Sequence, residues 1–97
     1  MEPELKRKWV DALRSGKFEQ GKTKLEENGR YCCLGVLRHI VDPKDMRYQP
    51  ALGGGSLLNG EQLKEYGLTS DEQITLSTIN DRGKPFSEIA DYIEEHL

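Results

Sequence analysis

Apolar side chains recur at helical spacing near both ends of the chain. In residues 4–15 they lie three or four positions apart and consist of Leu5, Trp9, Ala12 and Leu13. Gly16 follows them and is a typical C-terminal stop. The second stripe begins after Pro85 and consists of Phe86, Ile89, Ala90, Ile93 and Leu97. The spacing predicts two amphipathic helices, each of which buries one face.

The segment TKLEENGRYCC, residues 23–33, predicts a β-hairpin. Asn28-Gly29 is the strongest short hairpin signal, because a two-residue type I′ turn needs a positive φ at both positions. A turn centred there pairs Glu27 with Arg30, Glu26 with Tyr31, Leu25 with Cys32 and Lys24 with Cys33. The first pair is opposite in charge and the third is apolar, so the register is chemically sensible. We therefore expect a hairpin over about residues 22–33.

The next segment, CCLGVLRHIV, carries an apolar stripe at helical spacing that consists of Cys33, Leu37, Ile40 and Val41. Gly35 lowers helix propensity by about 1 kcal/mol, so we expect it to mark close packing against a neighbouring segment. A strand that continues to Val41 is the alternative. Asp42-Pro43 ends the element in either case, because the residue before a proline avoids the helical region.

Residues 43–58, PKDMRYQPALGGGSLL, predict a loop or flap, because a GGGS segment has little order of its own. A short helix is expected after it. Asn59 would cap that helix, Leu63 and Tyr66 would face inward, and Gly67 would end it.

The segment TSDE, residues 69–72, is a capping-box pattern that predicts another helix running to about Asn80. The alternation in QITLST leaves a strand as the lesser possibility. Residues 80–83, NDRG, then predict a turn before the C-terminal helix.

These elements predict a single α+β domain over residues 1–97, with an N-terminal helix, a hairpin, and three or four short helices packed on it. A chain of 97 residues is one domain. It buries only roughly 60–65% of its unfolded surface, and so small a core benefits from a partner surface. We therefore expect a homo-oligomer.

Charge and hydropathy restrict the function classes. No apolar run approaches the ~20 residues that span a bilayer, which argues against a membrane partner. The opening MEPELKRKWVDAL is too charged for a signal peptide, so we expect a cytoplasmic protein. The net charge is −3, whereas nucleic-acid binders are normally basic. The charge is uneven: residues 1–50 carry 11 Lys and Arg against 8 Asp and Glu, and residues 51–97 carry 3 against 9.

The adjacent cysteines Cys32 and Cys33 are expected to be free thiols that fill the core. A disulfide between neighbours would distort the peptide that joins them. Zinc sites usually combine two chelating pairs at suitable spacing, and only His39 and His96 could join the cysteines. No metal or cofactor is therefore expected. Free cysteine is among the most buried residue types, which favours packing.

The stretch GKFEQGKT, residues 16–23, matches the phosphate-loop pattern G-x-x-x-x-G-K-T. A true phosphate loop lies between a buried strand and a helix N-terminus. Here a helix is expected before the stretch and a hairpin after it, so the context argues against an NTPase. Lys17, Lys22 and Lys24 could still offer positive charge to an anion, although ordinary solvated lysines are the commoner outcome.

The candidate ligand-binding residues are Arg30, Tyr31, Asn80, Asp81 and Lys84. Arg30 and Tyr31 lie beside a tight turn, where the guanidinium donors of Arg30 and the ring face of Tyr31 suit a phosphate or a nucleobase. The other three surround the start of the C-terminal helix, whose first N–H groups are free. The competing interpretation is that Arg30 pairs with Glu27 and that Asn80 and Asp81 form the turn. No catalytic residue is predicted.

Three motifs resemble those of a family of small proteins encoded by tailed phages and prophages. They are W-x-x-A-L-R-S-G at residues 9–16, C-C-L-G-V at residues 32–36, and N-D-x-G-x-x-F-x-E-I-A-D-x-I-E at residues 80–94. Residues 43–68 have no clear counterpart, and Arg38-His39 stands where members often carry Cys-Asp. The resemblance implies a phage setting, and hence the host cytoplasm, rather than a reaction.

The leading functional expectation is a non-enzymatic protein that counteracts host defence by sequestering a small anionic, nucleotide-derived ligand, with the GGGS segment as a lid. The first alternative is an inhibitor of a host protein that uses an acidic surface consisting of Glu88, Asp91, Glu94 and Glu95. The second alternative is a small nucleotide hydrolase.

Overall fold

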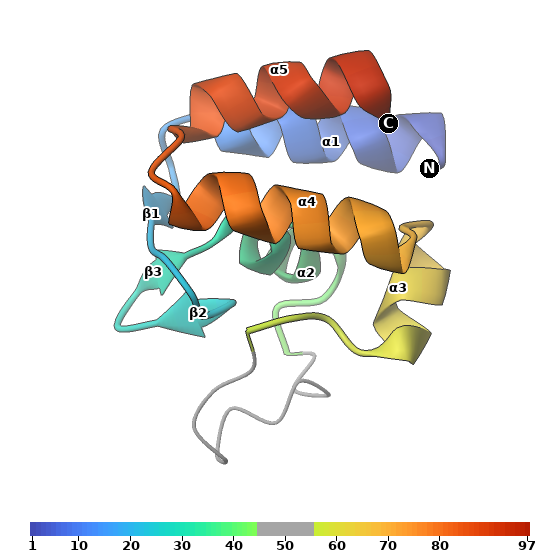
Figure 1. Ribbon diagram of the computed structural model, residues 1–97, viewed down its shortest axis with the longest axis horizontal. Helices are drawn as coiled ribbons and strands as arrows, with labels where there is room; N and C mark the ends of the chain where they lie inside the picture. The colour runs from blue at the N-terminus through green and yellow to red at the C-terminus, as the bar shows by residue number, and fades with distance from the viewer. Residues whose placement is uncertain (45–55) are drawn as a thin grey trace.

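Five helices and three two-residue strands make up the described part of the chain, which is residues 1–44 and 56–97 of a computed structural model (Figure 1). In chain order they are α1 (Pro3–Arg14), β1 (Glu19–Gln20), β2 (Glu26–Glu27), β3 (Arg30–Tyr31), α2 (Cys33–Val41), α3 (Gly60–Tyr66), α4 (Ser70–Asp81) and α5 (Phe86–His96). The predicted α+β class is confirmed, with four helices after the hairpin.

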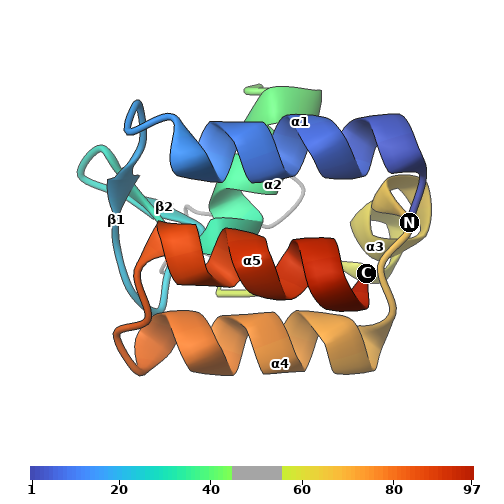
Figure 2. The ribbon, with the colours of Figure 1, turned by 90° about the horizontal axis from the view of Figure 1, so that it is seen from above.

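The two terminal helices lie side by side and antiparallel, and α4 runs along the other flank of α5 (Figure 2). The core lies where these helices meet α2, and its fully buried side chains include Trp9, Leu34, Leu37, Leu76, Ile89 and Ile93. The indole Nε1 of Trp9 donates a hydrogen bond of 2.9 Å to the carbonyl oxygen of Cys33. This bond joins α1 to the first residue of α2.

Local signals set the ends of the helices. Thr69 completes the predicted capping box with Glu72, and Asn59 caps α3 as predicted and forms a capping box with Gln62 as well. Gly67 ends α3 in the left-handed region with a φ of 79°. Residues 33–41 and the QITLST segment are both helical, so the strand alternatives are wrong.

The predicted hairpin is confirmed, although its strands are shorter than residues 22–33. Asn28 and Gly29 have φ values of 54° and 78°, as a type I′ turn requires. Glu27 pairs with Arg30 and Glu26 pairs with Tyr31, which is the predicted register. The pairing stops there, because Cys33 already begins α2.

Strand β1 was not predicted. It pairs in parallel with β3, so that the sheet order is β1-β3-β2. The expected flap of residues 43–58 lies largely outside the described residues, as does the GGGS lid. In the part of the chain that is described, no helix combines the length and apolar character needed to cross a membrane.

Gly35 brings α2 against the backbone that leads into β2. A Cβ at this position would lie 1.7 Å from the carbonyl oxygen of Leu25, which is far inside van der Waals contact. The predicted close packing at this glycine is confirmed, and it fixes the hairpin on the helix.

Candidate functional site

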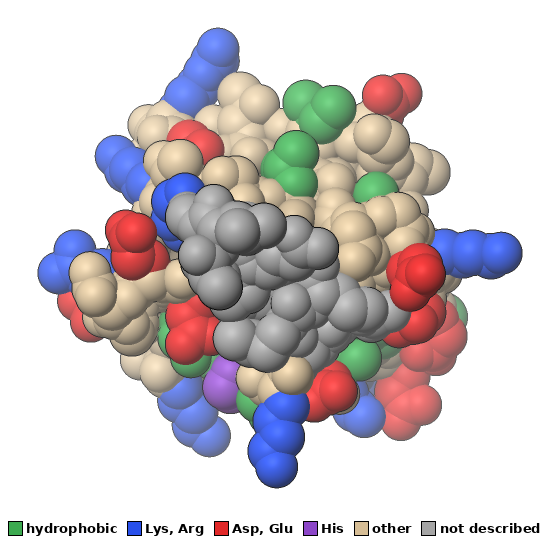
Figure 3. Space-filling model, turned by 90° about the horizontal axis from the view of Figure 1, so that it is seen from below, with side chains coloured by type: hydrophobic (Ala, Val, Ile, Leu, Met, Phe, Trp, Pro, Cys, Tyr) green, Lys and Arg blue, Asp and Glu red, His purple; other side chains and the backbone are tan. Residues whose placement is uncertain are grey.

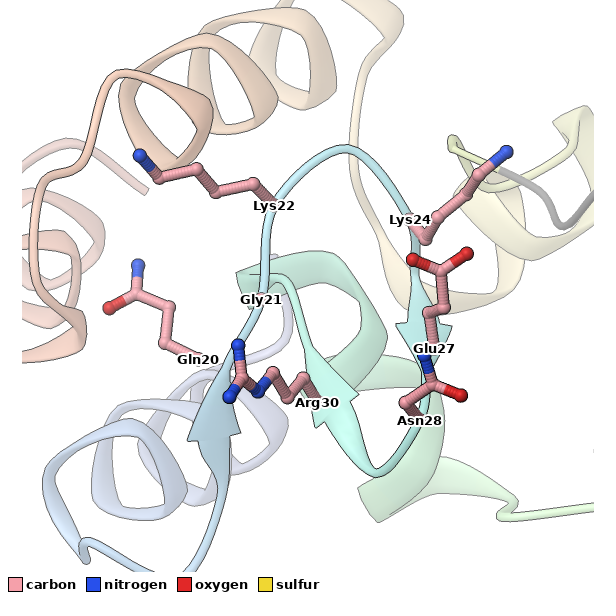
Figure 4. Close-up of a pocket in the computed structure, with 7 residues that line it drawn as sticks. All are labelled: Gln20, Gly21, Lys22, Lys24, Glu27, Asn28 and Arg30. Atoms are coloured by element: carbon pink, nitrogen blue, oxygen red, sulfur yellow. The ribbon is translucent and has the colours of Figure 1, made fainter.

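A hollow of about 600 Å³ opens between the β1–β2 connection and the hairpin turn (Figure 4). Its lining residues are Gln20, Gly21, Lys22, Lys24, Glu27, Asn28 and Arg30. Three of these side chains are cationic at neutral pH and one is anionic, so the lining carries a net positive charge. We call this feature the basic hollow.

Gly21 allows the β1–β2 connection to pass close to β3. Its N–H donates a hydrogen bond of 2.8 Å to the carbonyl oxygen of Tyr31, which continues the β1–β3 pairing. A Cβ at Gly21 would lie 3.0 Å from the Cβ of Arg30. A side chain at this position would therefore press on Arg30 at the edge of the hollow.

Thr23 holds the connection in a strained conformation. Its φ is 74°, which is a genuine outlier for a β-branched residue. The N–H of Lys24 donates to the carbonyl oxygen of Lys22 at 2.8 Å, so Thr23 is the central residue of a tight three-residue turn. The N–H of Thr23 donates to Oδ1 of Asp81 at 2.8 Å, which fastens this turn to the end of α4.

Asn80 fastens the same connection from inside the protein. Its side chain is fully buried. Oδ1 accepts hydrogen bonds from Nε2 of Gln20 at 3.0 Å and from the N–H of Cys33 at 3.2 Å. Nδ2 donates to the carbonyl oxygen of Gly21 at 2.9 Å and, at 3.4 Å, to Oδ1 of Asp81. The amide is thus fully used in joining β1, α2 and α4.

Within the described part of the chain, Arg30 is held only by an exposed ion pair. Nε of Arg30 pairs with Oε1 of Glu19 at 3.4 Å, and these side chains are 61% and 67% exposed. An exposed pair of this kind contributes at most about 1 kcal/mol, so a ligand can replace it. Lys22 and Lys24 leave the connection in opposite directions, and Arg30 points towards Gln20 (Figure 4). The ammonium of Lys22 lies over the α4–α5 junction, because a Cβ at Gly83 would be 3.7 Å from Nζ.

The five predicted site residues do not gather in one pocket. Arg30 lines the basic hollow. Tyr31 follows it in the strand and therefore faces the opposite side of the sheet, where its ring packs edge-to-face on Phe18 and His39 at centroid distances of 5.2 and 5.4 Å. Asn80 and Asp81 support the hollow from outside its lining. Lys84 lines a separate, smaller hollow between α4 and α5.

Six of the seven lining residues lie outside the predicted site, and for three of them the sequence carried a signal. Lys22 and Lys24 had been noted as possible anion partners, and the GKT of the phosphate-loop match contains the first of them. Asn28 had been assigned to the turn alone. The phosphate-loop interpretation itself fails, because α1 precedes the stretch and β2, not a helix, follows Thr23.

The thiols are packed inside the protein, as predicted. Cys32 and Cys33 are free and 3% and 0% exposed. Burial raises the pKa of the Cys32 thiol to about 11, although the backbone N–H groups of Gly35 and Leu34 oppose the shift. Burial also raises the pKa of Cys33, and its Sγ lies 3.6 Å from the carbonyl oxygen of Leu76. Protonated, buried thiols are poor nucleophiles.

The acidic surface proposed for a protein partner is partly neutralised within the chain. Arg14 of α1 donates to Asp91 at 2.6 Å and to Glu94 at 2.7 Å, both on α5. On the face seen from below, basic and acidic side chains are interspersed around the visible rim (Figure 3). The opposite charges of the two halves of the chain therefore meet in the folded molecule.

A family model described as "Domain of unknown function (DUF8296)" matches residues 1–67 of the chain. The match includes the whole lining of the basic hollow and ends before α4, which carries Asn80 and Asp81. Neither the curated proteins nor the solved structures gave a significant match.

Proposed function

We propose that this chain, which belongs to the DUF8296 family, a domain of unknown function, binds a small anionic ligand in the basic hollow and acts by holding that ligand. The observation that carries this proposal is the lining, in which Lys22, Lys24 and Arg30 oppose the single carboxylate of Glu27.

The chemistry of the hollow suits a phosphorylated ligand. Its volume of about 600 Å³ is in the range of small-molecule sites, and a nucleotide fits that range. Arginine and lysine are the side chains that pair with phosphate oxygens, by bidentate hydrogen bonds and as point charges respectively. We therefore take a nucleotide-derived anion as the ligand.

The lining favours binding over reaction. The seven residues that line the hollow include neither cysteine nor histidine, which most often serve as nucleophile and general base. The phage-type motifs supply the biological setting of the proposal: capture of a nucleotide-derived signal would counteract a host defence that depends on that signal.

Isothermal titration calorimetry tests the proposal. The probes are ATP, a cyclic dinucleotide and pyrophosphate, with uncharged adenosine as the control ligand. We expect at least one of the anions to bind, more weakly as salt rises, and adenosine not to bind. The double variant Lys22→Ala, Arg30→Ala should bind that anion at least about tenfold more weakly.

The matched control variant is Lys64→Ala, which removes an exposed lysine of α3 away from the hollow. It should leave the affinity unchanged. Absence of binding to all three anions, or an equal affinity in the double variant and the parent, would overturn the proposal. Release of inorganic phosphate during the titration would instead support a hydrolase.

A further inference from the structure

The chain contains two Asn-Gly pairs, Asn28-Gly29 in the hairpin turn and Asn59-Gly60 at the start of α3. Such a pair is chemically reactive, because glycine has no side chain that keeps its backbone nitrogen away from the asparagine side chain. The structure holds the two pairs very differently.

Asn28-Gly29 is open to water and to rearrangement. Both residues are exposed, and a Cβ built on Gly29 would have no atom of a non-adjacent residue within 4 Å. In the part of the chain that the structure describes, neither the N–H of Gly29 nor the side-chain amide of Asn28 makes a hydrogen bond. The strands that the turn joins have two residues each, so little pairing opposes a change in the turn.

Asn59-Gly60 is held in a helix cap. Oδ1 of Asn59 accepts a hydrogen bond of 2.8 Å from the N–H of Gln62, and Oε1 of Gln62 accepts one of 2.9 Å from the N–H of Asn59. The Asn59 side chain is therefore directed into the first turn of α3, where Gly60 has helical backbone. The amide of Asn59 must leave this cap before it can react with the nitrogen of Gly60.

We propose that Asn28 is a site of spontaneous modification, at which the side-chain amide becomes a carboxylate in the lining of the basic hollow. The nitrogen of Gly29 loses its proton to hydroxide and attacks Cγ of Asn28, which closes a succinimide ring. Ammonia leaves with a proton from water, and this restores the hydroxide. Water then opens the ring: attack on Cγ breaks its bond to the ring nitrogen and gives aspartate, whereas attack on the main-chain carbonyl carbon gives isoaspartate. Water is the co-reactant, and no atom is oxidised or reduced.

The product changes the charge of the basic hollow. Asn28 lines the hollow together with three cations and one carboxylate, that of Glu27 (Figure 4). A second carboxylate repels an anion, and isoaspartate also adds a main-chain carbon to the turn, which disturbs the pairing of Glu27 with Arg30. The modification therefore weakens anion binding as the protein ages, a consequence that rests on the proposed function.

Peptide mapping by mass spectrometry tests the modification without any ligand. The folded protein is incubated in mildly alkaline buffer and digested with trypsin, which separates the two Asn-Gly pairs because Arg30 and Arg38 lie between them. The mass change from amide to acid should accumulate at Asn28 at least about fivefold faster than at Asn59, the factor expected from a helix cap of ordinary strength. In urea, where the cap is lost, both pairs should react at similar rates. No reaction at Asn28 in the folded protein, or a rate no greater than that at Asn59, would overturn the proposal.

Calorimetry measures the consequence for the hollow, with whichever of ATP, a cyclic dinucleotide and pyrophosphate binds most tightly. The incubated parent should bind this anion more weakly than fresh protein does. Asn28→Asp, which has the charge of the product, should bind it at least about threefold more weakly than the parent. Asn28→Gly also suits a type I′ turn but has no amide, so its affinity should be the same before and after incubation.

The two measurements fail separately. A parent that has reacted at Asn28 and keeps its full affinity would overturn the effect on the hollow. Absence of binding to all three anions would overturn the proposed function and that effect with it, whereas the modification is decided by the peptide map, which needs no ligand.

Discussion

Asn80 is the residue on which the shape of the basic hollow depends most directly. Its buried amide binds Gln20, Gly21 and the first N–H of α2. Asn80→Ala would leave the N–H of Cys33 and the carbonyl of Gly21 without this partner. A buried polar group that loses its partner costs about 1–3 kcal/mol, so we expect the free energy of unfolding to fall by about 3 kcal/mol in urea titrations.

Thr75→Ala is the matched control for Asn80→Ala, because Thr75 is an exposed residue of the same helix. It should change the free energy of unfolding by less than about 0.5 kcal/mol. Equal stability of the Asn80 variant and the parent would contradict the role that we assign to this amide.

The contacts of single residues also show what could not be predicted from the sequence. Asn80 and Asp81 lie at a helix junction, as the sequence predicts, but their partners lie at Gln20, Gly21 and Thr23, about 60 positions away. Local patterns carry no information about such contacts. Arg30 and Tyr31 were predicted to share a site because both lie beside the hairpin turn, although strand geometry sends successive side chains to opposite faces.

At the scale of elements, the contact between α2 and the segment that leads into the hairpin leaves no room for a side chain at Gly35. Gly35→Ala would place a methyl group 1.7 Å from the carbonyl oxygen of Leu25, and backbone atoms must shift to accept it. We expect a loss of about 3 kcal/mol or more, at the upper end of overpacking effects. The thermal unfolding midpoint should fall accordingly.

Gly60→Ala is the control for this prediction, because a Cβ at Gly60, in the first turn of α3, would have open space around it. Alanine has the higher helix propensity, so the control should be neutral or slightly stabilising. Similar midpoints for both variants would show that α2 can move away from the hairpin without cost.

The elements that the sequence predicted are those with a local signal. Capping boxes, apolar stripes and Asn28-Gly29 each depend on residues within a few positions of one another. Strand β1 has no such signal, since Glu19-Gln20 is short and polar and is a strand only because β3 lies beside it. The basic hollow depends on β1, so its full lining could not be predicted.

At the scale of the whole molecule, folding removes the charge asymmetry of the chain. Residues 1–50 are basic and residues 51–97 are acidic, yet α1 and α5 come from opposite halves and lie against each other. Arg14 joins them through Asp91 and Glu94. The positive charge of the basic hollow is therefore a local property that the net charge of −3 conceals.

The two buried thiols make the stability of the whole molecule sensitive to alkaline pH. A thiol in the unfolded chain has its ordinary pKa of 9.0, whereas burial in the folded protein raises the pKa of the Cys32 thiol to about 11. Between these values the unfolded state has lost the proton and the folded state has kept it, so stability falls as pH rises. A difference of this size corresponds to about 3 kcal/mol for Cys32 once the pH exceeds 11.

Urea titrations at pH 8 and pH 10.5 measure this loss, and Cys32→Ala separates it from the titration of lysines and tyrosines, which both proteins share. The variant has one buried thiol fewer, so its stability should fall less between the two pH values than that of the parent. An equal fall in both proteins would mean that Cys32 ionises as readily in the folded state as in the unfolded chain. Its thiol would then have to be accessible to water, and the packing of Cys32 beneath the hairpin could not be as tight as its 3% exposure implies.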